Sequence, residues 1–66
     1  MQLIINGKAK ETPELGTLAD LAEWLLLPPF GSAVELNGQV IRKAEYAASL
    51  LKDQDRLEIV RLVGGG

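Results

Sequence analysis

The chemistry open to this chain of 66 residues is limited first by what its sequence lacks. It contains neither cysteine nor histidine, so it has no thiolate nucleophile, no imidazole general base and no usual set of zinc ligands. Carboxylates, four lysines, a few hydroxyls and the chain ends remain. A G-x-x-x-x-G-K-[ST] motif is absent, so we expect no ATP phosphate site and no cofactor bound by the chain itself. A self-sufficient enzyme is the weakest hypothesis.

The three glycines that end the sequence, Gly64, Gly65 and Gly66, have a possible chemical use. They follow the strand-like run "RLEIVRLV". Glycines carry no Cβ, so such a segment can enter a narrow channel in another protein, and three residues extend roughly 10 Å. It would deliver the Gly66 carboxylate, which a partner can activate by transferring AMP from ATP and a sulfur donor can convert into a thiocarboxylate. We expect a folded domain over residues 1–63 and a flexible tail over 64–66.

Composition and charge restrict the class of protein. A hydrophobic content of 47% predicts a single folded domain, and the absence of cysteine excludes disulfides. The net charge is −2 and the basic residues are scattered, whereas nucleic-acid binding usually shows a basic stripe. No apolar run reaches the length of a membrane span, and no signal peptide is apparent. We expect a cytoplasmic protein that binds neither nucleic acid nor membrane.

The first half of the sequence predicts a hairpin followed by a helix. Asn6-Gly7 is a preferred two-residue hairpin turn, and Leu3 and Ile5 share one face of the strand before it. A helix is predicted from Thr17, a good N-cap, to Leu26. Its apolar stripe comprises Leu18, Leu21, Ala22 and Leu25. The pair Pro28-Pro29 ends it.

The second half predicts another hairpin, an ambiguous connection and a last strand. Asn37-Gly38 forms the second turn, and residues 42–55 read either as one helical turn or as an irregular segment. In the last strand Leu57 and Ile59 alternate with Arg56 and Glu58. This order predicts an α+β fold with one main helix across a mixed four- or five-stranded sheet, the ubiquitin-like β-grasp layout, in which the first and last strands lie side by side in parallel.

The segments "ELNGQVI" and "DQDRLEIVRLVGGG", with the "INGK" hairpin and the "TLADLAEWL" helix, resemble the sulfur carrier family of bacterial thiamine biosynthesis. The likeness covers nearly the whole chain. It implies that Gly66 is adenylated by a ubiquitin-activating-type enzyme, which uses ATP, and receives sulfur from a donor as a thiocarboxylate. It implies that thiazole synthase then takes the sulfur, with Gly65 in the Gly-Gly motif and Gly64 extending the arm.

One turn departs from the family pattern. Relatives often have Asp-Gly-Asp before the last strand, where this chain has Asp53, Gln54 and Asp55. If that turn requires a positive φ, Gln54 is strained by about 1 kcal/mol. The two aspartates lack the later ligands of a calcium loop, and we expect a solvated turn there.

An apolar patch is predicted beside the tail. Strand alternation places Val60 and Leu62 opposite the helix, unless a bulge returns them to the core, and we expect them to form a docking surface with Val63. Phe30 either extends this patch or caps the core. Trp24 lies off the helix stripe, and we favour a filler of the core edge over a partner anchor.

Two further hypotheses remain for the function. The small subunit of molybdopterin synthase uses the same tail chemistry, but those chains tend to be longer and to have proline shortly before the glycines. A non-covalent ubiquitin-like interaction module, with an incidental tail, belongs to a different class. We expect a monomer when the chain is alone.

Overall fold

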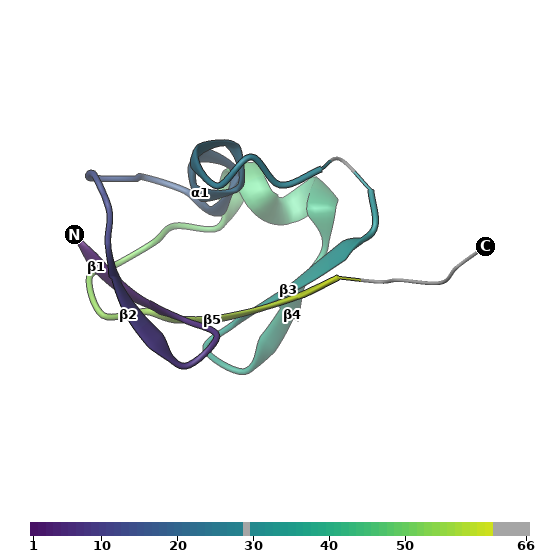
Figure 1. Cartoon of the computed structure of the whole chain (residues 1–66). Coiled ribbons are helices and arrows are strands. Elements are labelled where there is room, and N and C mark those ends of the chain that lie inside the picture. The colour runs from purple at the N-terminus through teal and green to yellow at the C-terminus, as the bar shows by residue number, and fades with distance from the viewer. Residues whose placement is uncertain (29, 62–66) are drawn as a thin grey trace.

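The computed structural model describes residues 1–28 and 30–61, which form a five-stranded mixed sheet with helical segments on one side (Figure 1). The strand order is β2-β1-β5-β3-β4, and β5 runs parallel to β1 and antiparallel to β3. This confirms the predicted β-grasp layout, including the adjacent first and last strands. The elements are β1 (Gln2–Ile5), β2 (Lys8–Glu11), α1 (Leu18–Trp24), β3 (Ser32–Leu36), β4 (Gln39–Ile41), the 3₁₀ helix η1 (Lys43–Ala48) and β5 (Arg56–Arg61).

Both hairpins turn on an asparagine–glycine pair, as predicted. Asn6 and Gly7 have φ of 51° and 80°, and Asn37 and Gly38 have φ of 52° and 86°. Two successive positive φ values give the turn whose twist matches that of the strands it joins. The two turns flank β5 on either side (Figure 1), and they point in opposite directions along it because β1 is parallel and β3 antiparallel to β5.

Helix α1 is shorter than predicted but begins at the expected residue. Thr17 is its N-cap, and Thr17 and Asp20 form a reciprocal capping box. At the other end the N–H of Leu27 donates to the Ala22 carbonyl and that of Leu26 to Glu23, the pattern of a Schellman cap. Leu26 therefore adopts a φ of 57°, a position that glycine usually occupies. The cap ends the helix before Pro28-Pro29, and Pro29 lies outside the described residues.

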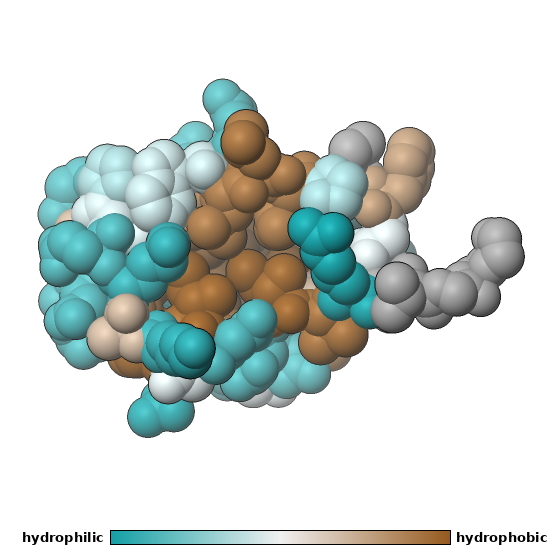
Figure 2. Space-filling view, viewed as in Figure 1, coloured by the Kyte–Doolittle hydropathy of each residue, from teal (hydrophilic) through white to brown (hydrophobic). Residues whose placement is uncertain are grey.

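The core lies between α1, η1 and the inner face of the sheet. Its fully buried side chains are Leu3, Leu18, Leu21, Val34 and Leu57. Each such side chain contributes about 1.5–3 kcal/mol by leaving water. The helix is only seven residues long, and Figure 2 shows apolar atoms still visible between it and the sheet from this side. Of the predicted α1 stripe, Leu18 and Leu21 are buried in this core, and Ala22 and Leu25 are partly buried against it.

The connection before β5 combines a 3₁₀ helix with an ordered turn. The sequence left open whether this segment is helical or irregular, and the structure shows the helix η1 over Lys43–Ala48. Tyr46 on η1 is buried. Gln54 has a φ of 74°, so the condition stated for strain at this residue is met. The prediction of a solvated turn is wrong for Asp55, which is 7% exposed. Its carboxylate accepts hydrogen bonds from the Lys52 N–H and the Asn37 amide, at 2.8 and 3.1 Å.

Candidate docking site at the end of the last strand

Strand β5 is the central strand, and its neighbours hold it unequally along its length. β1 pairs with it through Leu57, whereas β3 pairs with it up to Arg61, opposite Ser32. Leu57 is buried and Ile59 is half-buried, while Arg56 and Glu58 are exposed. The strand thus alternates as predicted, with one row of side chains in the core and the other on the open face of the sheet.

The asparagines of both hairpin turns bind the backbone of β5. The Ile59 N–H donates to Asn6 Oδ1 at 2.7 Å, and Asn6 Nδ2 donates to the Ile59 carbonyl at 3.3 Å. On the other side, the Arg56 N–H donates to Asn37 Oδ1 at 2.9 Å. These bonds fix the position of β5 from both flanks. The turn pattern predicted both asparagines as turn residues. It did not predict that their side chains form hydrogen bonds with the backbone of β5.

Of the three predicted docking residues, Val60 lies in the part of the chain that the structure describes. It pairs with Ala33 in an unbroken register from Leu36 to Ser32, and it is 50% exposed on the face away from α1. The alternative in which a bulge returns Val60 to the core is therefore wrong. Leu62 and Val63 lie outside the described residues, as do the predicted tail residues Gly64, Gly65 and Gly66.

Two exposed apolar side chains follow helix α1. Leu26 and Phe30 are 85% and 86% exposed, so Phe30 does not cap the core. The Lys43 ammonium lies 5.3 Å from the centre of the Phe30 ring, a cation–π distance. Leu26 combines a backbone conformation that costs about 1–2 kcal/mol with a side chain that gains little burial. Sequence reasoning missed Leu26, although the lack of a glycine after the helix was a usable signal.

Trp24 lies at the rim of the α1 layer rather than in the core. It is 40% exposed, and the Lys10 ammonium from β2 lies 5.7 Å from its ring centre. This contact joins α1 to the edge hairpin. The expectation of a core-edge filler is thus met only in part, because nearly half of the side chain remains open to solvent.

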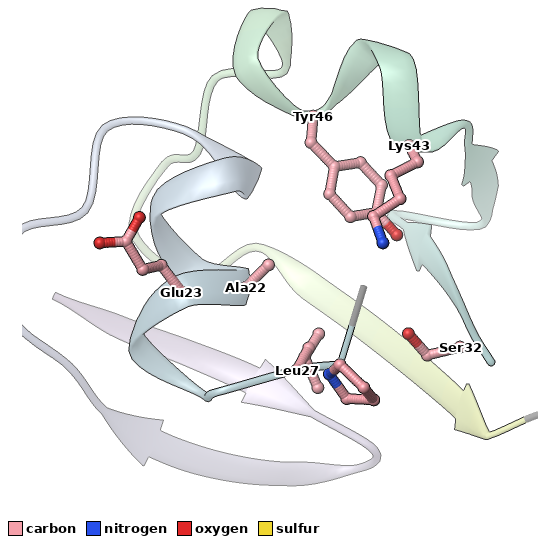
Figure 3. A pocket seen from close by; sticks show the side chains of 7 residues that line it. Ala22, Glu23, Leu27, Ser32, Lys43 and Tyr46 are labelled. Carbon is pink, nitrogen blue, oxygen red and sulfur yellow. The ribbon is translucent and has the colours of Figure 1, made fainter. Parts of the chain in front are cut away.

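A small hollow separates α1 from η1 (Figure 3). Its volume is about 160 Å³, and its lining includes Ala22, Leu27, Ser32, Lys43 and Tyr46. In Figure 3 the Tyr46 and Lys43 side chains point from η1 toward Ser32. Burial raises the pKa of the Tyr46 hydroxyl above its usual value. The hollow is smaller than the roughly 300 Å³ at which ligand pockets begin, so we assign it no ligand.

Asp53 is a described carboxylate that bonds to the backbone of β1. Within residues 1–28 and 30–61, no group of three or more Asp and Glu side chains is placed to hold an ion. Asp53 Oδ1 accepts a hydrogen bond from the Gln2 N–H at 2.6 Å. This bond, with a smaller effect from the Gln54 side chain, lowers the pKa of Asp53 below its ordinary value.

One pair on the open face was not found from the sequence. Glu35 on β3 lies directly opposite Glu58 on β5. Alternation along each strand placed both side chains on the outer face, but only the register between the strands brings them together.

In the described part of the chain no helix is long and apolar enough to cross a membrane.

The fold defines a small ubiquitin-like β-grasp domain with a central last strand. The profile of the ThiS family matches residues 3–66, and the chain belongs to the ThiS family. The resemblance inferred from the sequence is thereby confirmed.

Similar proteins fall into two size classes. The chain is 40% identical over 65 residues to the sulfur carrier protein ThiS of Bacillus subtilis, covering 97% of this chain and 98% of the relative. It is 36% identical over 66 residues to a thiazole synthase of Paramagnetospirillum magneticum, of which it spans only 20%. A crystal structure of the thiamine biosynthesis protein ThiS from Geobacter metallireducens superimposes with a TM-score of 0.82 at 30% identity, covering the whole of both chains.

Proposed function

We propose that this protein is a sulfur carrier of thiamine biosynthesis, acting as a protein co-substrate rather than as an enzyme. The observation that carries the proposal is the match to a named sulfur carrier along nearly the full length of both chains. The family match also extends to Gly66.

The proposed chemistry takes place at the carboxylate of Gly66. One of its oxygens attacks the α-phosphorus of ATP, and pyrophosphate leaves. A hydrosulfide equivalent from the sulfur donor then attacks the acyl carbon, and AMP leaves, so the carboxylate becomes a thiocarboxylate. Both steps occur in a ubiquitin-activating-type adenylating enzyme, and this chain contributes the substrate atom and a narrow glycine segment, Gly64–Gly66.

Thiazole synthase is the proposed sulfur acceptor. Two relatives of that name, from Paramagnetospirillum magneticum and Magnetococcus marinus, each contain a region similar to this whole chain, which spans 20% of their length. A carrier-like region inside a polypeptide named for thiazole synthesis supports a functional link between the two. We place the carrier with both partners in the cytoplasm, in agreement with the sequence prediction.

Intact mass spectrometry tests the proposal. The protein is incubated with ATP, a sulfide source and its own organism's adenylating enzyme, and a matched sample lacks ATP. We expect a mass gain equal to the difference between one sulfur and one oxygen atom, absent without ATP and absent in a variant that lacks Gly66. An unchanged mass with an active enzyme would instead favour the non-covalent interaction module. The mass of the untreated native protein establishes whether Gly66 carries the free carboxylate.

A further inference from the structure

Each hairpin turn of this fold contains an asparagine followed by glycine, the dipeptide in which an asparagine side chain reacts most readily with its own backbone. The glycine nitrogen can attack the carboxamide carbon, because glycine has no Cβ to obstruct the approach. A Cβ built on Gly7 or Gly38 would meet no atom within 4 Å. Neither glycine N–H donates a hydrogen bond to another residue in the part of the chain that the structure describes. Both nitrogens are therefore open to this reaction.

The surroundings of Asn37 differ from those of Asn6 in one respect. The side chain of Asn6 bonds to the backbone of Ile59. Asn37 Oδ1 likewise accepts from a backbone group, the Arg56 N–H, at 2.9 Å, but its Nδ2 donates to Oδ1 of Asp55 at 3.1 Å. Asp55 is 7% exposed. The Asn37 amide is thus a hydrogen-bond donor to a buried carboxylate.

Loss of the amide nitrogen would turn this attraction into a repulsion. Deamidation replaces the amino group of Asn37 by an oxygen, which would face the Asp55 carboxylate across the 3.1 Å that the hydrogen bond now spans. Two carboxylates so close together cannot both be ionised without a cost. Arg56 contacts Asn37 through its backbone, and its guanidinium forms no ion pair among residues 1–28 and 30–61. The new charge would therefore have no partner in that region.

We propose that Asn37 is a site of spontaneous deamidation, which the native fold suppresses and which, once complete, releases β5 from the β3–β4 turn. The Gly38 nitrogen bonds to Asn37 Cγ, and ammonia leaves with the proton of the Gly38 N–H. Water then opens the cyclic imide at either carbonyl, giving an aspartate or an isoaspartate. In the native turn both polar atoms of the Asn37 side chain are held, so Cγ reaches the nitrogen only when the turn opens.

Either product weakens the attachment of β5. The aspartate product opposes Asp55, and the isoaspartate product adds a backbone atom to a two-residue turn whose length sets the register of β3 and β4. The Asn37 N–H also donates to the Arg56 carbonyl at 2.7 Å, so Asn37 holds both backbone groups of Arg56. Because β5 begins at Arg56, the modified chain loses the fixed start of its central strand.

Site-resolved mass spectrometry of the full chain tests the protection. The protein is incubated at mildly alkaline pH in native buffer and in denaturing urea at the same temperature, and Asn37 and Asn6 are read separately. We expect deamidation of Asn37 to be at least about tenfold slower in native buffer, because only the small open population reacts. Asp55→Ala should raise the rate at Asn37 relative to that at Asn6, whereas global unfolding would raise both alike. Equal rates at Asn37 in the two solutions, or no reaction in either, would overturn the proposal.

Thermal unfolding tests the consequence of the modification. N37D mimics the aspartate product, and N6D is its matched control in the other turn. We expect the midpoint of N37D to lie at least about 5 °C below that of N6D. N37D/D55N should recover the midpoint, because the amide at position 55 can donate to the carboxylate at position 37 while its oxygen still accepts from the Lys52 N–H. Equal midpoints for N37D and N6D, or a double variant no more stable than N37D, would show that repulsion from Asp55 does not release the strand.

Discussion

Asn6 holds Ile59 through both polar atoms of its side-chain amide. Its Oδ1 accepts from the Ile59 N–H at 2.7 Å, and its Nδ2 donates to the Ile59 carbonyl at 3.3 Å. Strand β1 ends at Ile5, so the amide continues the β1–β5 ladder by one pair with a side chain in place of backbone. Asn6 also adopts the φ of 51° that the turn requires. Asparagine meets both demands, whereas glycine would meet only the second.

The substitution Asn6→Gly should separate these two roles. The turn conformation remains available to a glycine at this position, while both side-chain hydrogen bonds are lost. Two net hydrogen bonds contribute about 1–2 kcal/mol, so we expect urea unfolding to show a loss of about that size. Amide hydrogen exchange at Ile59 should accelerate, whereas the amide of Glu58, which faces β3, serves as the internal control. Equal protection of the Ile59 amide in the native protein and in Asn6→Gly would show that the Asn6 side chain does not hold Ile59.

Removal of the buried Asp55 carboxylate should lower the free energy of unfolding, although the sequence placed this residue in a solvated turn. Asp55→Ala leaves the Lys52 N–H and the Asn37 amide without their acceptor. An unsatisfied buried donor costs about 1–3 kcal/mol, and we expect a loss in that range by chemical denaturation. Asp53→Ala is the matched control, since Asp53 is exposed. Equal losses in the two variants would mean that the burial of Asp55 is not what matters.

Asp53 and Asp55 lie two residues apart, yet Asp53 is exposed and Asp55 is buried, and the sequence did not predict this difference. Short-range patterns predicted the turns, the helix start and the core stripe, because each depends on residues a few positions apart. The order of the elements along the chain then predicted the β-grasp layout of the sheet. The burial of Asp55 depends on Asn37, eighteen residues earlier in the chain, and the opposition of Glu35 and Glu58 depends on the register of two strands. Register is a property of the assembled sheet, and no local pattern in either strand states it.

The left-handed backbone at Gln54 predicts a stabilising substitution. Its φ of 74° is unfavourable for a residue with a Cβ. Gln54→Gly removes that strain but gives the unfolded chain more freedom, so we expect a net gain of about 0.5–1 kcal/mol. Gln54→Ala is the control, because it removes the side chain and keeps the strain. Thermal unfolding should rank glycine above the native residue, and a glycine variant no more stable than alanine would refute the argument.

The lowered pKa of Asp53 predicts that the fold loses part of its stability in acid. Its pKa is lowered, first by the Gln2 N–H and then by the Gln54 side chain. A carboxyl group whose folded pKa lies below its unfolded value adds stability above the unfolded pKa, near pH 4. That contribution is lost as the pH falls through the lower, folded value. The thermal midpoint of the native protein should therefore drop more steeply below about pH 4 than that of Asp53→Asn. Parallel profiles would show that the Gln2 bond does not favour the ionised form.

Gly65→Val tests whether the terminal glycines are needed for passage rather than for folding. If Gly66 must reach an activating site through a narrow channel, a branched Cβ one residue earlier should obstruct it, because only glycine presents bare backbone on all sides. We expect thiocarboxylate formation, followed by intact mass, to fall at least about tenfold, a barrier change of about 1.4 kcal/mol. The thermal midpoint should stay at the native value. A marked drop in that midpoint would show instead that Gly65 packs against the domain, and normal thiocarboxylate formation would show that the channel does not require glycine.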